Sequence, residues 1–198
     1  MIRFTELGQE IPYSILKKKY DAALAANQKN IEAISISSYS TKLREVNSRF
    51  VNLKFVNNNE FIFFSNYNSP KSQEFIDHNQ ITALIYWNTT NTQIRLKATI
   101  NKTSAEFNKK YFLDRSDQKN ALAISSNQSE SIDSFETVLL NYSKSLELDN
   151  LKKCPDYWGG FSFTPYYFEF WEGHESRLNK RDLYQINNGE WCHSILQP

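Results

Sequence analysis

The chain has 198 residues, a formal net charge of +1, and 40% hydrophobic and 15% aromatic residues. This length suits one full-sized core, so residues 1–198 are predicted to form a single domain. The near-neutral charge favours neither nucleic acid nor an anionic membrane as a partner. The sequence contains no apolar signal core and no apolar run of eighteen residues, so a cytoplasmic protein is predicted. Cys154 and Cys192 are too few for a disulfide framework and are predicted to be free thiols.

The first half of the chain combines helical and strand patterns. Leu16, Tyr20 and Leu24 recur at helical spacing behind Pro12, which predicts a helix over about 13–27. A second, short helix is predicted over 69–78. Strand patterns occupy 31–38, 49–56, 61–64, 81–87 and 93–101. The turn Asn57-Asn58-Asn59 predicts that 49–56 and 61–64 pair as a hairpin.

The second half begins with helical patterns and ends with strand patterns. Helices are predicted over 104–123 and 131–148, separated by the polar stretch 125–129. Strands are predicted over 160–171, 182–186 and 190–195, and Asn187-Asn188-Gly189 marks the last hairpin turn. Because strand pairs dominate, the predicted fold is mainly β: an antiparallel β-barrel with flanking helices.

Cationic residues on or beside the strands are the main candidates for ligand binding. They interleave with aromatic residues such as Phe50, Phe64, Tyr111 and Trp171. Phosphate oxygens need charge-assisted donors and a planar ring needs a flat apolar wall, so the set suits a phosphorylated aromatic ligand. It would also suit a groove for single-stranded nucleic acid, which the net charge disfavours. The cationic set is Arg49, Lys54, Lys71, Arg95, Lys97, Arg115, Arg177 and Arg181.

No other catalytic pattern is present in the sequence. His78, His174 and His193 lack metal-ligand spacing, so no metal site is predicted. Gly159-Gly160 is not a phosphate-binding loop, and no G-x-S-x-G nucleophile motif occurs. The chemistry is therefore predicted to come from a cofactor. Four aromatic residues of the C-terminal block are predicted to be core: Trp158, Phe161, Phe168 and Trp191.

The C-terminal block, about 157–198, carries the most specific pattern. It contains Tyr157-Trp158-Gly159-Gly160-Phe161, Phe168-Glu169-Phe170-Trp171-Glu172-Gly173, Arg177-Leu178 and Arg181. In order and spacing this block resembles the C-terminal signature of the pyridoxine/pyridoxamine 5′-phosphate oxidases, a family of FMN flavoproteins. The resemblance extends from about residue 31 to 198. It implies an FMN-binding split β-barrel and a homodimer whose two FMN sites are built from both subunits.

The resemblance also implies which residues bind FMN. Arg49-Phe50-Val51-Asn52-Leu53-Lys54 is similar to the family's Arg-x-Val-Leu-Leu-Lys strand, which places Arg49 on the FMN phosphate. Gln128-Ser129 matches a Gln-Ser pair that touches FMN from the second subunit, and Pro70 stands where the family has an arginine. The implied cofactor-binding set is Arg49, Phe50, Val51, Phe64, Ser65, Lys71, Gln93, Gln128, Ser129, Trp171 and Arg181.

Substrate contacts follow from the same resemblance. Lys119 replaces a family serine, and Arg177 falls on the arginine over the substrate ring. The histidine expected two residues later is Asn179, which can donate a hydrogen bond but cannot titrate near neutral pH. Arg177 and Asn179 are the implied catalytic residues. The implied substrate-binding residues are Lys54, Tyr111, Arg115, Lys119 and Arg177.

The activity implied is that of an FMN-dependent oxidase. It would convert pyridoxamine or pyridoxine 5′-phosphate to pyridoxal 5′-phosphate by hydride transfer to the flavin, with O2 as the reoxidant. Two alternatives stay open. Asn179 and Lys119 motivate an FMN-dependent oxidoreductase with a different substrate. Pro70 and Asn179 motivate a non-catalytic protein that binds flavin or pyridoxal phosphate.

Overall fold

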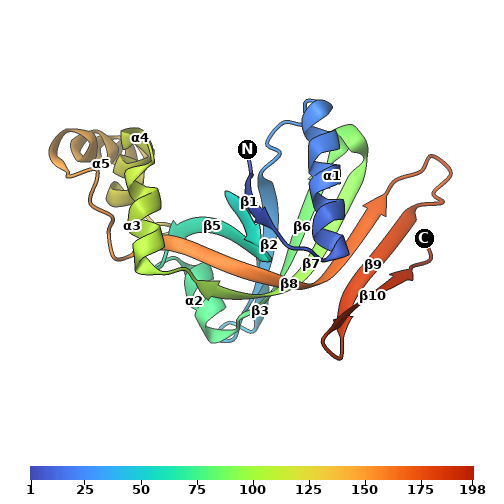
Figure 1. Cartoon of the computed structure of the whole chain (residues 1–198). Helices are drawn as coiled ribbons and strands as arrows, with labels where there is room; N and C mark the ends of the chain where they lie inside the picture. The colour runs from blue at the N-terminus through green and yellow to red at the C-terminus, as the bar shows by residue number, and fades with distance from the viewer.

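The computed structural model describes residues 1–198 and contains ten strands in one sheet with helices around it (Figure 1). The strands are β1 (Arg3–Leu7), β2 (Ala33–Ser40), β3 (Glu45–Asn52), β4 (Phe55–Asn58), β5 (Glu60–Asn66), β6 (Gln80–Trp87), β7 (Thr92–Lys102), β8 (Trp158–Glu172), β9 (Lys180–Asn187) and β10 (Glu190–Ile195). The helices are α1 (Ile11–Ala25), α2 (Pro70–Asp77), the 3-10 turn η1 (Asn88–Thr90), α3 (Ala105–Leu113), α4 (Asp117–Ser125) and α5 (Phe135–Leu148).

The strand order is β1-β4-β5-β8-β7-β6-β2-β3, and β9 and β10 continue from β8. The long strand β8 joins two parts of the sheet. Its first half pairs with β5 and its second half with β9, while β7 runs beside both. A register shift between Lys97 and Ala98 lies opposite Pro165, where the strand can bend. All pairs are antiparallel except β1 with β4.

The core is a cluster of 25 buried residues between the curved sheet and α1. Inward positions alternate along β6 and β7, as a half-buried strand requires. Helix α1 contributes Tyr13, whose ring packs edge-on against Phe168 and Trp191. The predicted core residues Trp158, Phe161 and Phe168 are buried, and Trp191 is half-buried against this core.

Three element predictions were wrong in detail. The run 49–56 is not one strand paired with 61–64, because the chain leaves β3 at Asn52 and β4 starts at Phe55. The Leu53 N–H donates to Glu32 O at 2.8 Å and the Lys54 N–H to Ile62 O at 2.8 Å, so the backbone changes partner strand at this step. The predicted helix 104–123 is two helices, since the chain leaves the helical conformation at 114–116, and Ser116, the residue before α4, is in an extended conformation. Strand β1 had no predicted counterpart.

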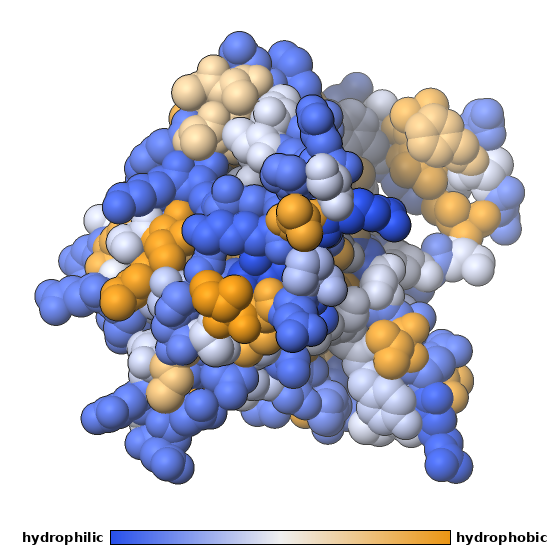
Figure 2. Space-filling view, turned by 90° about the vertical axis from the view of Figure 1, so that its right-hand side faces the viewer, coloured by the Kyte–Doolittle hydropathy of each residue, from blue (hydrophilic) through white to orange (hydrophobic).

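Helices α3, α4 and α5 lie together at the end of the sheet opposite the C-terminal hairpin β9–β10 (Figure 1). Seen from the hairpin side, the surface is mostly hydrophilic, and the apolar side chains stand in separate small groups (Figure 2). No helix of the chain has the length and apolar character needed to cross a bilayer. Cys154 and Cys192 are both free thiols, as predicted.

Candidate active site

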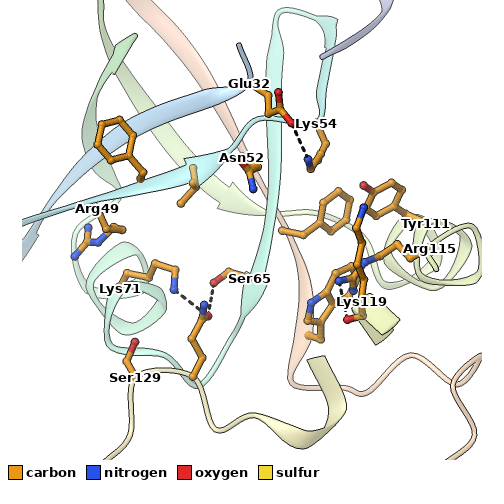
Figure 3. A pocket seen from close by; sticks show the side chains of 15 residues that line it. Glu32, Arg49, Asn52, Lys54, Ser65, Lys71, Tyr111, Arg115, Lys119 and Ser129 are labelled. Atoms are coloured by element: carbon orange, nitrogen blue, oxygen red, sulfur yellow. Dashed lines mark hydrogen bonds and ion pairs between the residues drawn. The ribbon is translucent and has the colours of Figure 1, made fainter. Parts of the chain in front are cut away.

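A cavity of about 690 Å³ opens between β3, β5, α2, α3 and the loop after α4 (Figure 3). It collects every predicted site residue except Gln93, Trp171, Arg177, Asn179 and Arg181. Its lining residues are Glu32, Arg49, Phe50, Val51, Asn52, Lys54, Phe64, Ser65, Lys71, Tyr111, Arg115, Lys119, Gln128, Ser129 and Trp158. The cations form two groups on opposite sides of the cavity, called here the Arg49 end and the Arg115 end (Figure 3).

The Arg49 end contains Arg49, Ser65, Lys71, Gln128 and Ser129. Arg49 extends from β3 and donates to Glu74 Oε2 at 3.0 Å and to Ser38 Oγ at 2.5 Å. Glu74 is a buried carboxylate of α2 that also accepts from Asn47 Nδ2 at 2.9 Å. The guanidinium is therefore held in one orientation and its charge is largely balanced. Sequence reasoning missed Glu74 because no local pattern links α2 to β3.

Lys71 is the second cation of the Arg49 end. Unlike Arg49, it has no carboxylate within salt-bridge distance. Its ammonium is almost buried and donates to Ser69 Oγ at 3.1 Å and to Gln128 Oε1 at 3.0 Å. Burial, together with the nearby charge of Arg49, lowers the pKa of Lys71 to about 8, although Glu74 opposes the shift. A bound anion would favour the protonated form.

Gln128 is tied to the same end by its side-chain oxygen. Oε1 accepts from Ser65 Oγ at 2.9 Å, from the Asn66 N–H at 3.2 Å and from Lys71 Nζ. With the oxygen saturated, the amide NH2 is the part left to meet a ligand. The resemblance implied that Gln128 and Ser129 reach the flavin from a second subunit. Within one chain, both residues lie beside Ser65 and Lys71, and the subunit from which they would reach the flavin stays a prediction.

The Arg115 end contains Lys54, Tyr111, Arg115 and Lys119. Arg115 follows α3 in the break before α4, and its Nη2 donates to Lys119 O at 3.0 Å. Its Nη1 is buried and has no hydrogen-bond partner. Burial lowers the pKa of the Arg115 guanidinium. An unpaired buried guanidinium nitrogen is costly, so this atom indicates a place for an anionic oxygen.

Stacked aromatic rings form the wall beside the Arg115 end. Phe64 lies 4.0 Å from Tyr111 and 5.1 Å from Trp158, centroid to centroid, with nearly parallel planes. The Arg115 guanidinium lies over the Trp158 ring, 4.4 Å from its centroid. Sequence reasoning assigned Trp158 to the core, and it is buried, but its ring also lines the cavity.

Glu32 is the one carboxylate that lines the cavity, and it was not predicted. It precedes β2, and its Oε1 lies 3.9 Å from Lys54 Nζ. Burial lowers the pKa of Lys54; Glu32 opposes this shift, and the charges of Lys119 and Arg115 add to it. The charges of Arg115 and Lys119 are therefore close enough to repel that of Lys54, and Glu32 lines the same part of the cavity.

Three predicted residues form a row on the outer face of the sheet instead of lining the cavity. Gln93 of β7 pairs in register with Trp171 of β8, and Trp171 pairs with Arg181 of β9. Directly paired residues share a sheet face, so the three side chains lie on one surface, called here the β7–β9 face. In the sheet order, strands β2, β6 and β7 lie between β8 and β3, the strand that carries Arg49 and other cavity residues.

A buried carboxylate organises the β7–β9 face. Glu169 accepts from Arg181 Nε at 3.0 Å and Nη2 at 2.8 Å, from Tyr167 at 3.0 Å and from Arg95. Burial alone would raise the pKa of Glu169, but these hydrogen bonds and the two arginine charges outweigh it and hold the pKa below its usual range. Arg181 is therefore fixed by its own chain.

Arg177 and Asn179 lie in the loop between β8 and β9. Arg177 is exposed and has a φ of 60°, a left-handed conformation that is uncommon for arginine. Asn179 Oδ1 accepts from the His174 N–H at 3.0 Å, which closes the loop. The amide that replaces the expected histidine thus holds the loop that carries Arg177.

Taken together, the cavity offers an anion site at each end and a wall of stacked aromatic rings beside the Arg115 end, which suits ligands that combine an anionic group with a planar ring. No group of three His, Cys, Asp or Glu side chains is placed to hold a metal ion. The cavity volume lies within the range of small-molecule and cofactor sites.

Comparison with known proteins places the chain in a family. Residues 158–198 match the model of the pyridoxine 5′-phosphate oxidase C-terminal dimerisation region. Pyridoxine/pyridoxamine 5′-phosphate oxidase 1 of Hydrogenovibrio crunogenus is 32% identical over 194 residues, covering 96% of this chain and 89% of the relative. Pyridoxine/pyridoxamine 5′-phosphate oxidase of Vesicomyosocius okutanii is 33% identical over 170 residues, covering 85% of this chain and 80% of the relative.

Two solved structures share the fold. PhzG from Burkholderia lata, solved with tetrahydrophenazine-1-carboxylic acid, has a TM-score of 0.89 at 24% identity and covers 94% of this chain and 92% of that one. A pyridoxamine 5′-phosphate oxidase-related, FMN-binding protein from Nostoc punctiforme has a TM-score of 0.79 at 13% identity and covers 96% and 100%. These likenesses confirm the predicted split barrel. With relatives 32% and 33% identical along most of its length, the chain belongs to the pyridoxine/pyridoxamine 5′-phosphate oxidase family of FMN-dependent oxidases.

Proposed function

We propose that this protein is an FMN-dependent oxidase that converts pyridoxamine or pyridoxine 5′-phosphate to pyridoxal 5′-phosphate. The observation that carries the proposal is the cavity with a cationic group at each end and a stacked aromatic wall. FMN and the substrate each combine a phosphate with a planar ring, so two such ligands need two anion sites. We also infer a single domain over 1–198, because one core cluster runs from Ile2 to Phe170, and we expect a cytoplasmic location.

The Arg49 end fits the FMN phosphate. Lys71 and the Gln128 amide provide donors there, and Ser129 lines the same end. Arg49 adds a guanidinium that Glu74 keeps in place. Pro70 removes the arginine of the family pattern, so fewer cations hold the phosphate and a moderate FMN affinity is expected. Bound FMN would accept the hydride of the oxidation and pass the electrons to O2.

The Arg115 end fits the substrate phosphate. The unpartnered Nη1 of Arg115 would donate to a phosphate oxygen, and Lys54 and Lys119 would add charge. The stacked rings of Tyr111 and Phe64 would shield one side of a bound substrate from water. By holding the phosphate, these residues would orient the substrate ring toward the flavin, so that proximity accounts for much of the rate.

A homodimer would complete the site. Within one chain the β7–β9 face and the loop carrying Arg177 are not part of the cavity wall. The 158–198 segment matches a dimerisation region and contains Trp171, Arg177, Asn179 and Arg181. We infer that a second copy brings these residues over the cavity. Asn179 would then act as a hydrogen-bond donor and not as a titrating group.

The first test is an anaerobic absorbance spectrum of the protein with FMN, before and after addition of pyridoxamine 5′-phosphate. Bleaching of the flavin band is the expected result. A flavin band that stays oxidised would contradict the proposed substrate, and no flavin band at all would contradict the cofactor.

Substitution of the Arg115 end provides the second test. Arg115→Gln should raise the KM for pyridoxamine 5′-phosphate by about a hundredfold, since a charge-assisted pair contributes about 2–3 kcal/mol. Lys54→Ala should act in the same direction. The exposed Arg44→Gln should leave KM unchanged. An unchanged KM in Arg115→Gln would remove Arg115 from the phosphate site.

A second candidate is an FMN-dependent oxidase with another substrate. It is favoured by Lys119, which stands in place of a serine at the Arg115 end, and by Asn179, which stands in place of a histidine in the loop between β8 and β9. A panel of ring compounds with phosphate or carboxylate groups, offered to the flavin-loaded protein, separates the two candidates. Full activity with pyridoxamine 5′-phosphate would exclude the second candidate.

A further inference from the structure

We propose that Glu32 is a specificity-determining residue: it makes the Arg115 end select an anion that still carries a proton, such as a singly protonated phosphate monoester. This inference deepens the proposed function, because it concerns the same anion site. Glu32 lines the cavity and its carboxylate lies 3.9 Å from Lys54 Nζ (Figure 3). An anion oxygen bound by Lys54 therefore comes within a few ångströms of the Glu32 carboxylate.

The charges around Glu32 keep it ionised. Lys54 faces it from the segment between β3 and β4, and the Met1 amine lies 3.5 Å away. The negative charge of Glu32 also helps to raise the pKa of Tyr20 on α1. Burial alone would raise the pKa of Glu32, but its backbone hydrogen bond, the Met1 amine and Lys54 outweigh this and lower the pKa. An ionised carboxylate can only accept hydrogen bonds.

Two anions of equal charge are then distinguished by their protons. A fully deprotonated anion brings a lone pair toward the Glu32 oxygens, which is repulsive. A protonated phosphate instead donates an O–H to the carboxylate, which is a strong charge-assisted hydrogen bond. Lys119 fits this arrangement, because its ammonium offsets the negative charge of Glu32 and leaves the full charge of Lys54 and Arg115 available to the anion.

Inorganic phosphate and sulfate are the sharpest probes. At about pH 8 both carry two negative charges and have the same tetrahedral shape, but phosphate retains one proton. Their dissociation constants are measured by calorimetry for the wild-type protein, Glu32→Gln and the control Glu60→Gln, an exposed residue of β5 outside the cavity. FMN is present at saturation to fill the Arg49 end. Thermal unfolding checks that each variant is folded.

The wild-type protein and Glu60→Gln should prefer phosphate over sulfate by about tenfold, the effect of one hydrogen bond to a charged group. Glu32→Gln should abolish the preference, mainly by binding sulfate more tightly. An unchanged ratio in Glu32→Gln would overturn the proposal. Equal weakening of both anions would also overturn it, since Glu32 would then only orient Lys54. Inorganic anions need no turnover, so a protein that fails to oxidise pyridoxamine 5′-phosphate still gives a clear answer.

Discussion

The cavity and the β7–β9 face differ in how their charges are balanced. In the cavity, Lys71 has no carboxylate partner within salt-bridge distance and Arg115 Nη1 has no hydrogen-bond partner. On the β7–β9 face, Glu169 holds both Arg95 and Arg181. An anion therefore gains most in the cavity, where donors are already assembled. The β7–β9 face instead presents a fixed surface, as one half of an interface requires.

The division into two regions predicts complementation between inactive variants. Arg115→Ala damages the cavity and Arg177→Ala damages the loop, so each homodimer should be nearly inactive. Co-expression should give half heterodimers, each with one intact site, and about a quarter of wild-type activity. The measurement is the oxidase rate of the mixture, with separately purified heterodimers identified by two different tags.

Failure to recover activity would contradict this division, because the cavity and the Arg177 loop would then act within one chain. Mixing two cavity variants, Arg115→Ala and Lys54→Ala, is the matched control. Their heterodimers carry one damaged cavity in each site and should stay inactive.

The carboxylate of the β7–β9 face predicts a smaller, structural effect. Glu169→Gln leaves two arginines without their shared partner and should lower the free energy of unfolding by about 2 kcal/mol at neutral pH. Because the folded pKa of Glu169 is below its unfolded value, this stabilisation is complete above the unfolded pKa and is lost as the pH falls through the folded pKa. Denaturant unfolding as a function of pH tests both statements.

In that series, the exposed Glu190→Gln should behave like the wild-type protein. If Glu169→Gln matched the wild-type stability at neutral pH, the carboxylate would not organise the face.

The smallest effect concerns Lys71. Its pKa of about 8 predicts that sulfate affinity at the Arg49 end falls by roughly tenfold between about pH 7 and 9, as the ammonium loses its proton. The unfolded chain keeps that proton to about pH 10.5, so the folded protein should gain stability as the pH rises between these values. Calorimetric titration and denaturant unfolding measure the two effects.

Lys71→Met should remove both pH dependences and stabilise the empty protein near neutral pH, because a buried cation is lost. Lys144→Met, on the exposed side of α5, should change neither. A pH dependence that survives in Lys71→Met would belong to another group.

Local patterns predicted most of the elements. The alternation in β6 and β7 is a property of each strand, and Ser104 and Ser134 cap their helices by accepting from Phe107 N and Thr137 N. The break at Leu53-Lys54 escaped prediction, because an extended run looks the same whether its partner strand changes or not. The charge partner of Arg49 was not predicted either, because Glu74 lies 25 residues away on another element and no local pattern connects the two.

The sequence by itself determined the family, the split barrel and most residues of the cavity, because motifs and periodicity are read over short spans. Only the tertiary structure decided which of those residues meet. It placed Glu74 against Arg49, Glu32 beside Lys54, and Gln93, Trp171 and Arg181 on a separate face. The physical reason is that charge balance and burial depend on contacts between distant segments, and these contacts form only when the sheet closes around its core.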